Sequence, residues 1–292
     1  MSGVGEARVL RLGGMALRNG LLVHGPTSWA AAIRAPDGRI HVASGRKPRA
    51  PRALIAVPGA RGVARLAEAM AVIPLVRRAL PQARLPFEDA AVAGAALTAS
   101  LGGALIRRRL GGARGDRAAV ALSVLPALVS LRSGDVAAYH GVEHKAIAAY
   151  EHGSEDAREA AKEHDRCGSH LLTPMLAANL AGGALLRRTV ERPGPLAGAL
   201  VSLASVGLAV EVFAWSERRA DTLFARALRW PGHELQRMLG TREPSDEQLD
   251  VGRAALAEIL RVEGVVPPTG EPGGAKGPSD RASAAPTPVQ PR

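Results

Sequence analysis

Four apolar segments in the middle of this 292-residue chain constrain its fold more than any other feature. They cover residues 90–106, 118–131, 171–186 and 195–210, and each runs for about 14 to 17 residues. An α-helix rises 1.5 Å per residue, so about 20 residues cross the roughly 30 Å hydrocarbon core of a bilayer. The segments are rich in Ala and Gly, which allow helices to pack closely in lipid. We therefore expect a mainly α-helical membrane protein with about four hydrophobic helices in two hairpins. The alternative is a large helical core in a soluble protein.

The fourth apolar segment is followed by Glu211 and then by further apolar residues. An ionisable group inside a membrane helix is costly, and this makes Glu211 a candidate functional residue and metal ligand. The alternative places it at the membrane surface beside Arg218 and Arg219.

The even number of apolar segments places the N-terminal region, the central polar region and the C-terminal region on one side of the membrane. The short connections within each hairpin are rich in Arg, and the positive-inside rule would put these connections in the cytosol. However, residues 1–20 show no signal-peptide pattern that could export a basic N-terminal region. We expect a multi-pass protein of the cell membrane whose polar regions lie in the cytosol.

The central polar region carries a pattern that is typical of a metal site. His140 and His144 stand four residues apart, so that on a helix both imidazoles project from one face. With Glu143 they form the order His-x-x-Glu-His of the inverted zinc proteases, in which two imidazoles hold zinc and the carboxylate acts on bound water. His164 and Cys167 are the nearest candidates for a further ligand. The alternatives are a polar helix with surface histidines, a Glu143 that only orients a histidine, and a buried, inert Cys167.

The two ends of the chain have clear local signals. Residues 30–34 and 39–43 form a predicted β-hairpin, because Pro36 sets φ and Gly38 supplies a left-handed position in the turn between them. Near the C-terminus, Ser245 to Gln248 has the pattern of a helix capping box, and it begins an amphipathic helix that ends near Gly264.

These patterns predict seven regions along the chain. They are an N-terminal β-rich domain (1–52), a helical connector (53–86), a hydrophobic hairpin (87–132), the His/Glu/Cys motif region (133–169), a second hydrophobic hairpin (170–216), a C-terminal helical region (217–264) and a disordered tail (265–292).

Composition narrows the expected partners. The formal net charge is +11, but aromatic residues are only 3% of the chain, which argues against a stacking surface for single-stranded nucleic acid. The Arg residues cluster beside the apolar segments, so we expect membrane lipids as partners and no nucleic acid. The single cysteine excludes an intrachain disulfide and fits a reducing compartment.

Several short motifs occur together and in order. They are Gly13-Gly14 followed by Gly20 and Gly25-Pro26, His140-Gly-x-Glu-His-Lys145, His164-x-Arg-Cys-Gly168 and Thr241-Arg-Glu-Pro244. Over residues 10–262 this combination resembles the YqhQ-like family of bacterial membrane proteins, which have been labelled predicted metal-dependent enzymes. The resemblance implies a membrane protein. The chain departs from the family's usual N-terminal run, because Met15, Asn19 and His24 stand where the family has Gln, Glu and Arg.

The sequence therefore favours a metal-dependent membrane enzyme, most simply a zinc-type hydrolase of unknown substrate. In this hypothesis His140 and His144 bind zinc or another divalent metal with help from His164 or Cys167, and Glu143 activates water. The alternative is a non-catalytic membrane scaffold that binds a membrane-protein partner or organises lipids, with a closed, structural His/Cys site.

Overall fold

The computed structural model describes residues 9–154, 156–191 and 193–265. Its strands are β1 (Gly13–Leu17), β2 (Gly20–His24), β3 (Ser28–Arg34) and β4 (Ile40–Arg46). The helices before the central region are α1 (Arg52–Ala56), α2 (Ala60–Met70), α3 (Ile73–Ala79), the 3₁₀ turn η1 (Pro86–Glu88), α4 (Ala90–Leu110), α5 (Gly112–Leu122) and α6 (Leu125–Ser130). They are followed by α7 (Val136–His152), the 3₁₀ turn η2 (Gly168–Leu171), α8 (Leu172–Thr189), α9 (Pro195–Arg218), α10 (Leu223–Leu235), the π-helical turn η3 (Gln236–Gly240) and α11 (Asp246–Val262).

The four strands form one antiparallel meander in the order β1-β2-β3-β4. The β3–β4 hairpin confirms the predicted turn, and Gly38 has the positive φ of 82° that the turn requires. Alternate side chains of the strands enter two different cores. Leu21 and Val23 pack with α7 and α11, whereas Leu22 and Ile33 pack with α3 on the other face.

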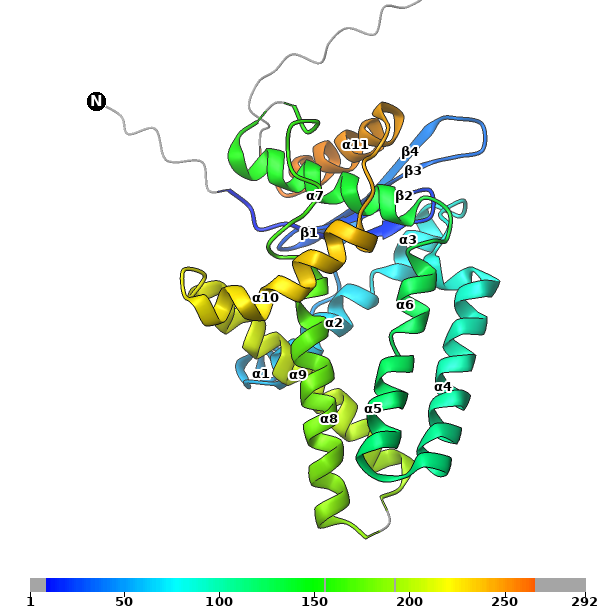
Figure 1. The fold of residues 1–292 in the computed structure, drawn as a ribbon. Coiled ribbons are helices and arrows are strands. Elements are labelled where there is room, and N and C mark those ends of the chain that lie inside the picture. The colour runs from blue at the N-terminus through cyan, green and yellow to red at the C-terminus, as the bar shows by residue number, and fades with distance from the viewer. Residues whose placement is uncertain (1–8, 155, 192, 266–292) are drawn as a thin grey trace, which may run out of the picture.

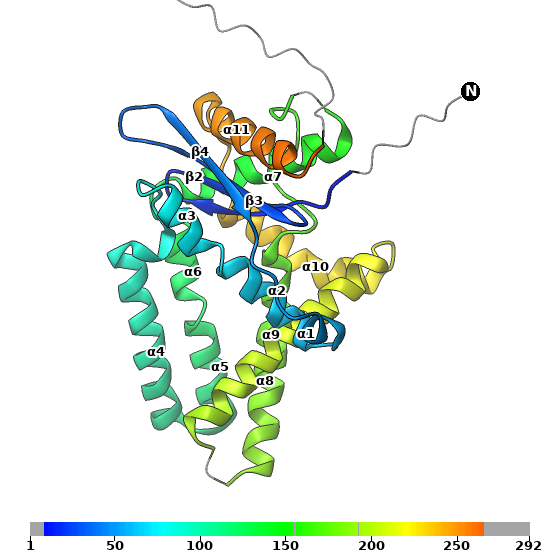
Figure 2. The same cartoon turned by 180° about the vertical axis from the view of Figure 1, so that it is seen from behind.

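The C-terminal helix α11 completes the first of these cores. The predicted capping box is present, since Ser245 Oγ accepts a hydrogen bond from the Gln248 amide and the Gln248 side chain accepts one from the Ser245 amide. α11 packs on β2, β3, β4 and α7. Gly252 permits this close approach, because a Cβ there would lie 2.3 Å from Val142 Cγ1. α7 and α11 therefore cover one face of the sheet, and we call these three parts the sheet–helix unit (Figures 1 and 2).

Two helical hairpins, α4–α5 and α8–α9, extend from the same side of the sheet–helix unit (Figure 1). The apolar segment 118–131 is divided in the structure: α5 ends at Leu122, and α6 begins at Leu125 with Pro126 in its first turn. Proline lacks the amide hydrogen that a continuous helix would use, but it is favoured in a first turn. Pro74 begins α3 in the same way.

Only two helices in the described ranges, α4 and α9, are long and apolar enough to cross a membrane. The expectation of four such helices is thus confirmed only in part, because α5 has 11 residues, a length of roughly 16 Å. The most apolar 18-residue window of α4, and that of α9, has only 17% of its residues buried. The core helix of a soluble protein would be mostly buried. The mainly helical fold with its N-terminal sheet is confirmed. The predicted tail, apart from residue 265, lies outside the described residues.

Candidate metal centre

Helix α7 carries the two histidines of the central motif. It spans Val136–His152, is buried on most of its surface and ends at Gly153, which adopts the left-handed conformation. It contacts β1, α11 and residues 156–167, and the polar side chains Glu143, His144 and Lys145 are buried by these contacts. His140 and His144 are one helical turn apart, and their ring centroids are separated by 4.3 Å.

Backbone carbonyls fix the tautomers of both rings. His140 Nδ1 lies 2.8 Å from the Gly240 carbonyl oxygen, and His144 Nδ1 lies 2.6 Å from that of Lys162. Because a carbonyl oxygen can only accept, each Nδ1 carries a hydrogen, and in the neutral ring Nε2 then carries the lone pair. His144 Nε2 is buried and has no hydrogen-bond partner among the described residues. Burial, with the nearby His140, lowers the pKa of His144 to about 3, so its ring is neutral at pH 7.

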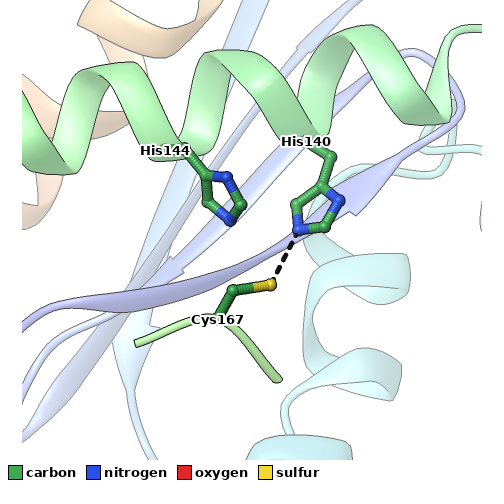
Figure 3. A group of neighbouring side chains, drawn as sticks. All are labelled: His140, His144 and Cys167. Carbon is green, nitrogen blue, oxygen red and sulfur yellow. Dashed lines mark hydrogen bonds between the residues drawn. The ribbon is translucent and has the colours of Figure 1, made fainter. Parts of the chain in front are cut away.

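Cys167 completes a group of three possible ligands (Figure 3). Its Sγ lies 3.3 Å from His140 Nε2, and the ligand atoms of His140, His144 and Cys167 all lie within 4.8 Å of one another. Burial raises the pKa of the Cys167 thiol, which can therefore donate its hydrogen to His140 Nε2. We refer to these three residues as the His/His/Cys cluster.

A buried lysine holds the loop that brings Cys167 to α7. The Lys145 ammonium donates to the carbonyl oxygens of Arg158 and Ala160, at 2.9 and 2.8 Å, and pairs with Glu243. Only 4% of Lys145 is exposed, and this burial is offset because all three hydrogens of the ammonium have acceptors.

The Thr241-Arg-Glu-Pro244 motif crosses α7 as an extended strap. The Arg242 amide donates to the Ala137 carbonyl at 2.9 Å. Gly141 makes the crossing possible, because a Cβ at this position would lie 2.5 Å from the Arg242 carbonyl oxygen. The π-helical turn η3 ends just before the strap, and its last residue, Gly240, supplies the carbonyl that orients His140.

Glu143 lies on the side of α7 that faces β1. It is buried, and its carboxyl group lies directly against Gly14 of β1. Gly14 leaves the room for this contact, since a Cβ there would lie 2.8 Å from Glu143 Cδ. Burial is the main cause that raises the pKa of Glu143 to about 7; the nearby Cys167 raises it further, whereas His140 and the Gly14 amide lower it. A carboxyl group with this pKa can both take up and release a proton near neutral pH.

His164 and Glu211 are not part of the cluster in the structure. The His164 ring centroid is 5.7 Å from that of His144, but its Nδ1 accepts from the Arg166 amide and its Nε2 faces Glu151 at 3.5 Å. Both ring nitrogens are thus already in use. Glu211, on α9, accepts from the Gly59 amide and pairs with Arg61 of α2.

The His/His/Cys cluster faces a cavity of about 560 Å³. Its polar lining comes mainly from α7 and residues 164–169, and includes Glu143 and His164. The rest of the lining is largely apolar and comes from β1 and the segment between α2 and α4. Such a volume lies within the range of small-molecule sites, about 300–1,000 Å³.

Several residues around the cluster were not predicted from the sequence. Glu151 follows His144 by seven residues on the same face of α7, and this spacing was the available signal. It pairs with Arg166 and His164. The backbone contributions of Gly240 and Lys162 have no sequence signal. Of the three departures from the family pattern, Met15 lines the cavity, whereas Asn19 bonds to the backbone of Arg34, Gln82 and Arg84, and His24 is largely buried.

The donor set fits a zinc-type ion. Zinc prefers imidazole nitrogen and thiolate sulfur, and histidine ligands commonly donate their second N–H to a carbonyl oxygen, as both histidines do here. The buried His144 Nε2 without a partner is the atom that such an ion would satisfy.

The part of the chain that contains the His/His/Cys cluster is similar to known proteins. Residues 129–262 match a family model described as a protein of unknown function (DUF1385). A protein of Bacillus subtilis (strain 168), named "Uncharacterized protein YqhQ", is 30% identical over 135 residues, which are 43% of this chain and 40% of that protein. The chain thus spans about two fifths of the length of this relative. No solved structure matches. The family match begins just before α7 and includes the strap and α11, so it supports the resemblance to the YqhQ-like family for that part of the chain.

Proposed function

We propose that the protein is a metal-dependent membrane hydrolase whose ion is held by His140, His144 and Cys167. The observation that carries this proposal is the buried Nε2 of His144, which has no partner among the described residues, in a group of three residues whose ligand atoms lie within 4.8 Å of one another. Zinc or another divalent metal is the expected cofactor. Three protein ligands beside a cavity are typical of a catalytic zinc site, because a position stays open for water or substrate.

The residues divide the work as follows. His140 and His144 present fixed Nε2 lone pairs, and Cys167 binds as a thiolate after losing its proton. When bound, the metal lowers the pKa of a coordinated water and polarises the scissile bond of the substrate. Glu143, one residue before His144, would take up a proton from the attacking water on its carboxylate and deliver it to the leaving group.

We infer that the protein is a multi-pass protein of the cell membrane, with the sheet, α7 and α11 in the cytosol, and that the whole chain is a YqhQ-like protein. Support for a membrane location comes from the exposed leucines of α4 and α9. Leu101 is 63% exposed and Leu196 is 74% exposed, and in water these surfaces would be unfavourable.

The competing function is a membrane scaffold with a structural metal site. It is favoured by the closeness of His164, which would complete a closed shell of four ligands if its ring turned away from Glu151. The adjoining cavity favours the hydrolase. In a structural zinc site protein ligands fill all four coordination positions, so no position is left open toward a cavity.

The first test is element analysis of the full chain purified in detergent. We expect one zinc-type ion per chain, and its loss in His144→Ala. His152→Ala is the matched control, since His152 lies on the same helix outside the cluster, where it bonds to the Ala148 carbonyl, and this variant should keep the metal. A metal-free wild type after zinc loading would contradict the proposal.

The second test separates the enzyme from the scaffold. Glu143→Gln should keep the metal but lower hydrolysis of p-nitrophenyl carboxylate and phosphate esters at least ~100-fold. X-ray absorption should find three protein ligands. Four protein ligands, or unchanged hydrolysis in Glu143→Gln, would make the scaffold the better description.

A further inference from the structure

The lining of the cavity beside the His/His/Cys cluster identifies a substrate class. Where α2 to α4 line it, the side chains are apolar: Met70, Ile73, Pro86, Phe87 and Val92. The polar side chains that could contact a reacting group come from α7 and residues 164–169, apart from Ser130. One cavity thus offers two kinds of surface, and each is contributed by different elements of the fold.

The apolar part of the cavity adjoins the candidate membrane helix α4. Phe87 lies in η1, directly before α4, and Val92 lies in the first turn of α4 itself. Phe87 and Met70 remain 51% and 49% exposed although they line the cavity. Exposed apolar side chains at the rim of a site favour a ligand that is itself apolar.

We propose that the substrate is a membrane-type amphiphile, with its polar, hydrolysable head at the His/His/Cys cluster and its acyl chain along Met70, Ile73 and Phe87. This inference rests on the proposed hydrolase and adds its substrate class. Because Val92 begins a helix expected to enter the bilayer, an acyl chain can reach the cavity from the membrane surface without crossing water. In the hydrolysis an ester bond of the head breaks, the oxygen of water bonds to the carbonyl carbon or the phosphorus, and one proton of that water leaves with the alcohol.

Photolabelling of the full chain in dimyristoylphosphatidylcholine nanodiscs tests the proposal. The probe is a monoacylglycerol with a diazirine in its acyl chain, and labelled residues are located by mass spectrometry. Leu101 and Leu203, exposed on α4 and α9, serve as the internal standard for labelling from the bilayer. We expect labelling of Met70, Ile73 or Phe87 that excess unlabelled monomyristoylglycerol or myristoyl-lysophosphatidate suppresses, while labelling of the standard persists. Glycerol 3-phosphate should not compete.

A matched pair of variants on α2 sharpens the test. Met70 and Leu66 are one turn apart and equally exposed at 49%, but only Met70 lines the cavity. Met70→Asp should lower the competed labelling about tenfold, because a carboxylate disfavours an acyl chain beside it, and Leu66→Asp should leave it unchanged. Retained metal in Met70→Asp shows that this variant is folded, and Phe87→Asp provides a second variant at an exposed position.

The outcomes distinguish this inference from the proposed function. Labelling that persists in metal-free His144→Ala supports the acyl-chain site independently of the metal. The inference is overturned if competitor suppresses labelling of the cavity residues no more than that of the standard, if Leu66→Asp acts like Met70→Asp, or if glycerol 3-phosphate competes as well as the acylated compounds. In that case metal binding by the wild type would still stand, with a water-soluble substrate.

Discussion

Gly141 is a single residue on which the packing of the strap against α7 depends. It is the point where the strap crosses α7, and a Cβ would meet the Arg242 carbonyl at 2.5 Å. We expect Gly141→Ala to lower the free energy of unfolding by about 1–2 kcal/mol, since overpacking outweighs the gain in helix propensity. It should also weaken metal binding, because Gly240 adjoins the strap. Thermal unfolding in detergent measures the first effect, and metal titration the second.

Gly94→Ala is the control for this substitution. Gly94 also lies inside a helix, but a Cβ there would have nothing within 4 Å. The variant should be as stable as the wild type, or more stable by up to about 1 kcal/mol. Equal effects of the two substitutions would show that the strap can move aside at little cost.

His24 provides a pH-dependent prediction outside the cluster. Burial, with a smaller effect of Lys47, lowers its pKa from 6.5 to about 4. Between these values the unfolded chain binds a proton that the folded protein does not, so stability is full above pH 6.5 and falls as the pH drops toward 4. At pH 5 the loss from this group is about 2 kcal/mol. His24→Gln should therefore show a smaller decrease in Tm between pH 7 and pH 5 than the wild type. An equal decrease would contradict this assignment.

The spacing of His140, His144 and Cys167 in the sequence was enough to make them candidate ligands of one site. Helical periodicity and closeness along the chain are local properties that can be read from the sequence. It gave no means of excluding His164, because that exclusion depends on Glu151 and on the Arg166 amide, which occupy its two ring nitrogens. The same limit applies to Glu211. Its partner Arg61 is 150 residues away in the sequence, and only the packing of α2 on α9 makes the pair.

At the scale of elements, α7 and the following loop act as one unit through Lys145. Lys145→Met keeps the apolar stem but leaves the carbonyl oxygens of Arg158 and Ala160 without their donor. We expect faster backbone hydrogen exchange in residues 156–167 and a metal affinity lowered by about 10- to 100-fold. Glu243→Gln is the control, because the Glu243 side chain is 65% exposed and its ion pair should contribute little. Unchanged exchange in Lys145→Met would mean that other contacts hold the loop.

The elements with local signals were predicted best. The turn at Gly38 and the capping box at Ser245 are both present, because each depends on a few adjacent residues. The break between α5 and α6 at Pro126 was missed, since apolar composition masked the local effect of proline. The packing of α11 on β2 to β4 could not be predicted from the sequence either. The pattern of an amphipathic helix shows that it has an apolar face, but not which distant surface that face covers.

At the scale of the whole molecule, the exposed apolar surfaces of α4 and α9 predict a membrane location. The protein should sediment with membranes and resist carbonate extraction, because these surfaces have no other apolar medium to enter. Recovery of a monodisperse protein without detergent would contradict this expectation.

The orientation in the membrane is a separate prediction. Both hairpins extend from the same side of the sheet–helix unit, so the ends of both hairpins should return to one compartment (Figure 2). Reporter fusions after Gly134 and after Gly264 should both report the cytosol. If both report the exterior, the short Arg-rich connections determine the orientation and the proposed topology is inverted.

The long-range closure of the core has a consequence for biosynthesis. Glu263 accepts from the amides of Thr27 and Ser28, 236 and 235 residues earlier, and α11 covers strands that are made before both hairpins. One apolar face of the sheet therefore stays without its covering helix α11 until the ribosome has synthesised both hairpins. A nascent chain that stops before residue 240 lacks the carbonyl that orients His140. The proposed metal centre can therefore form only after both hairpins have been made.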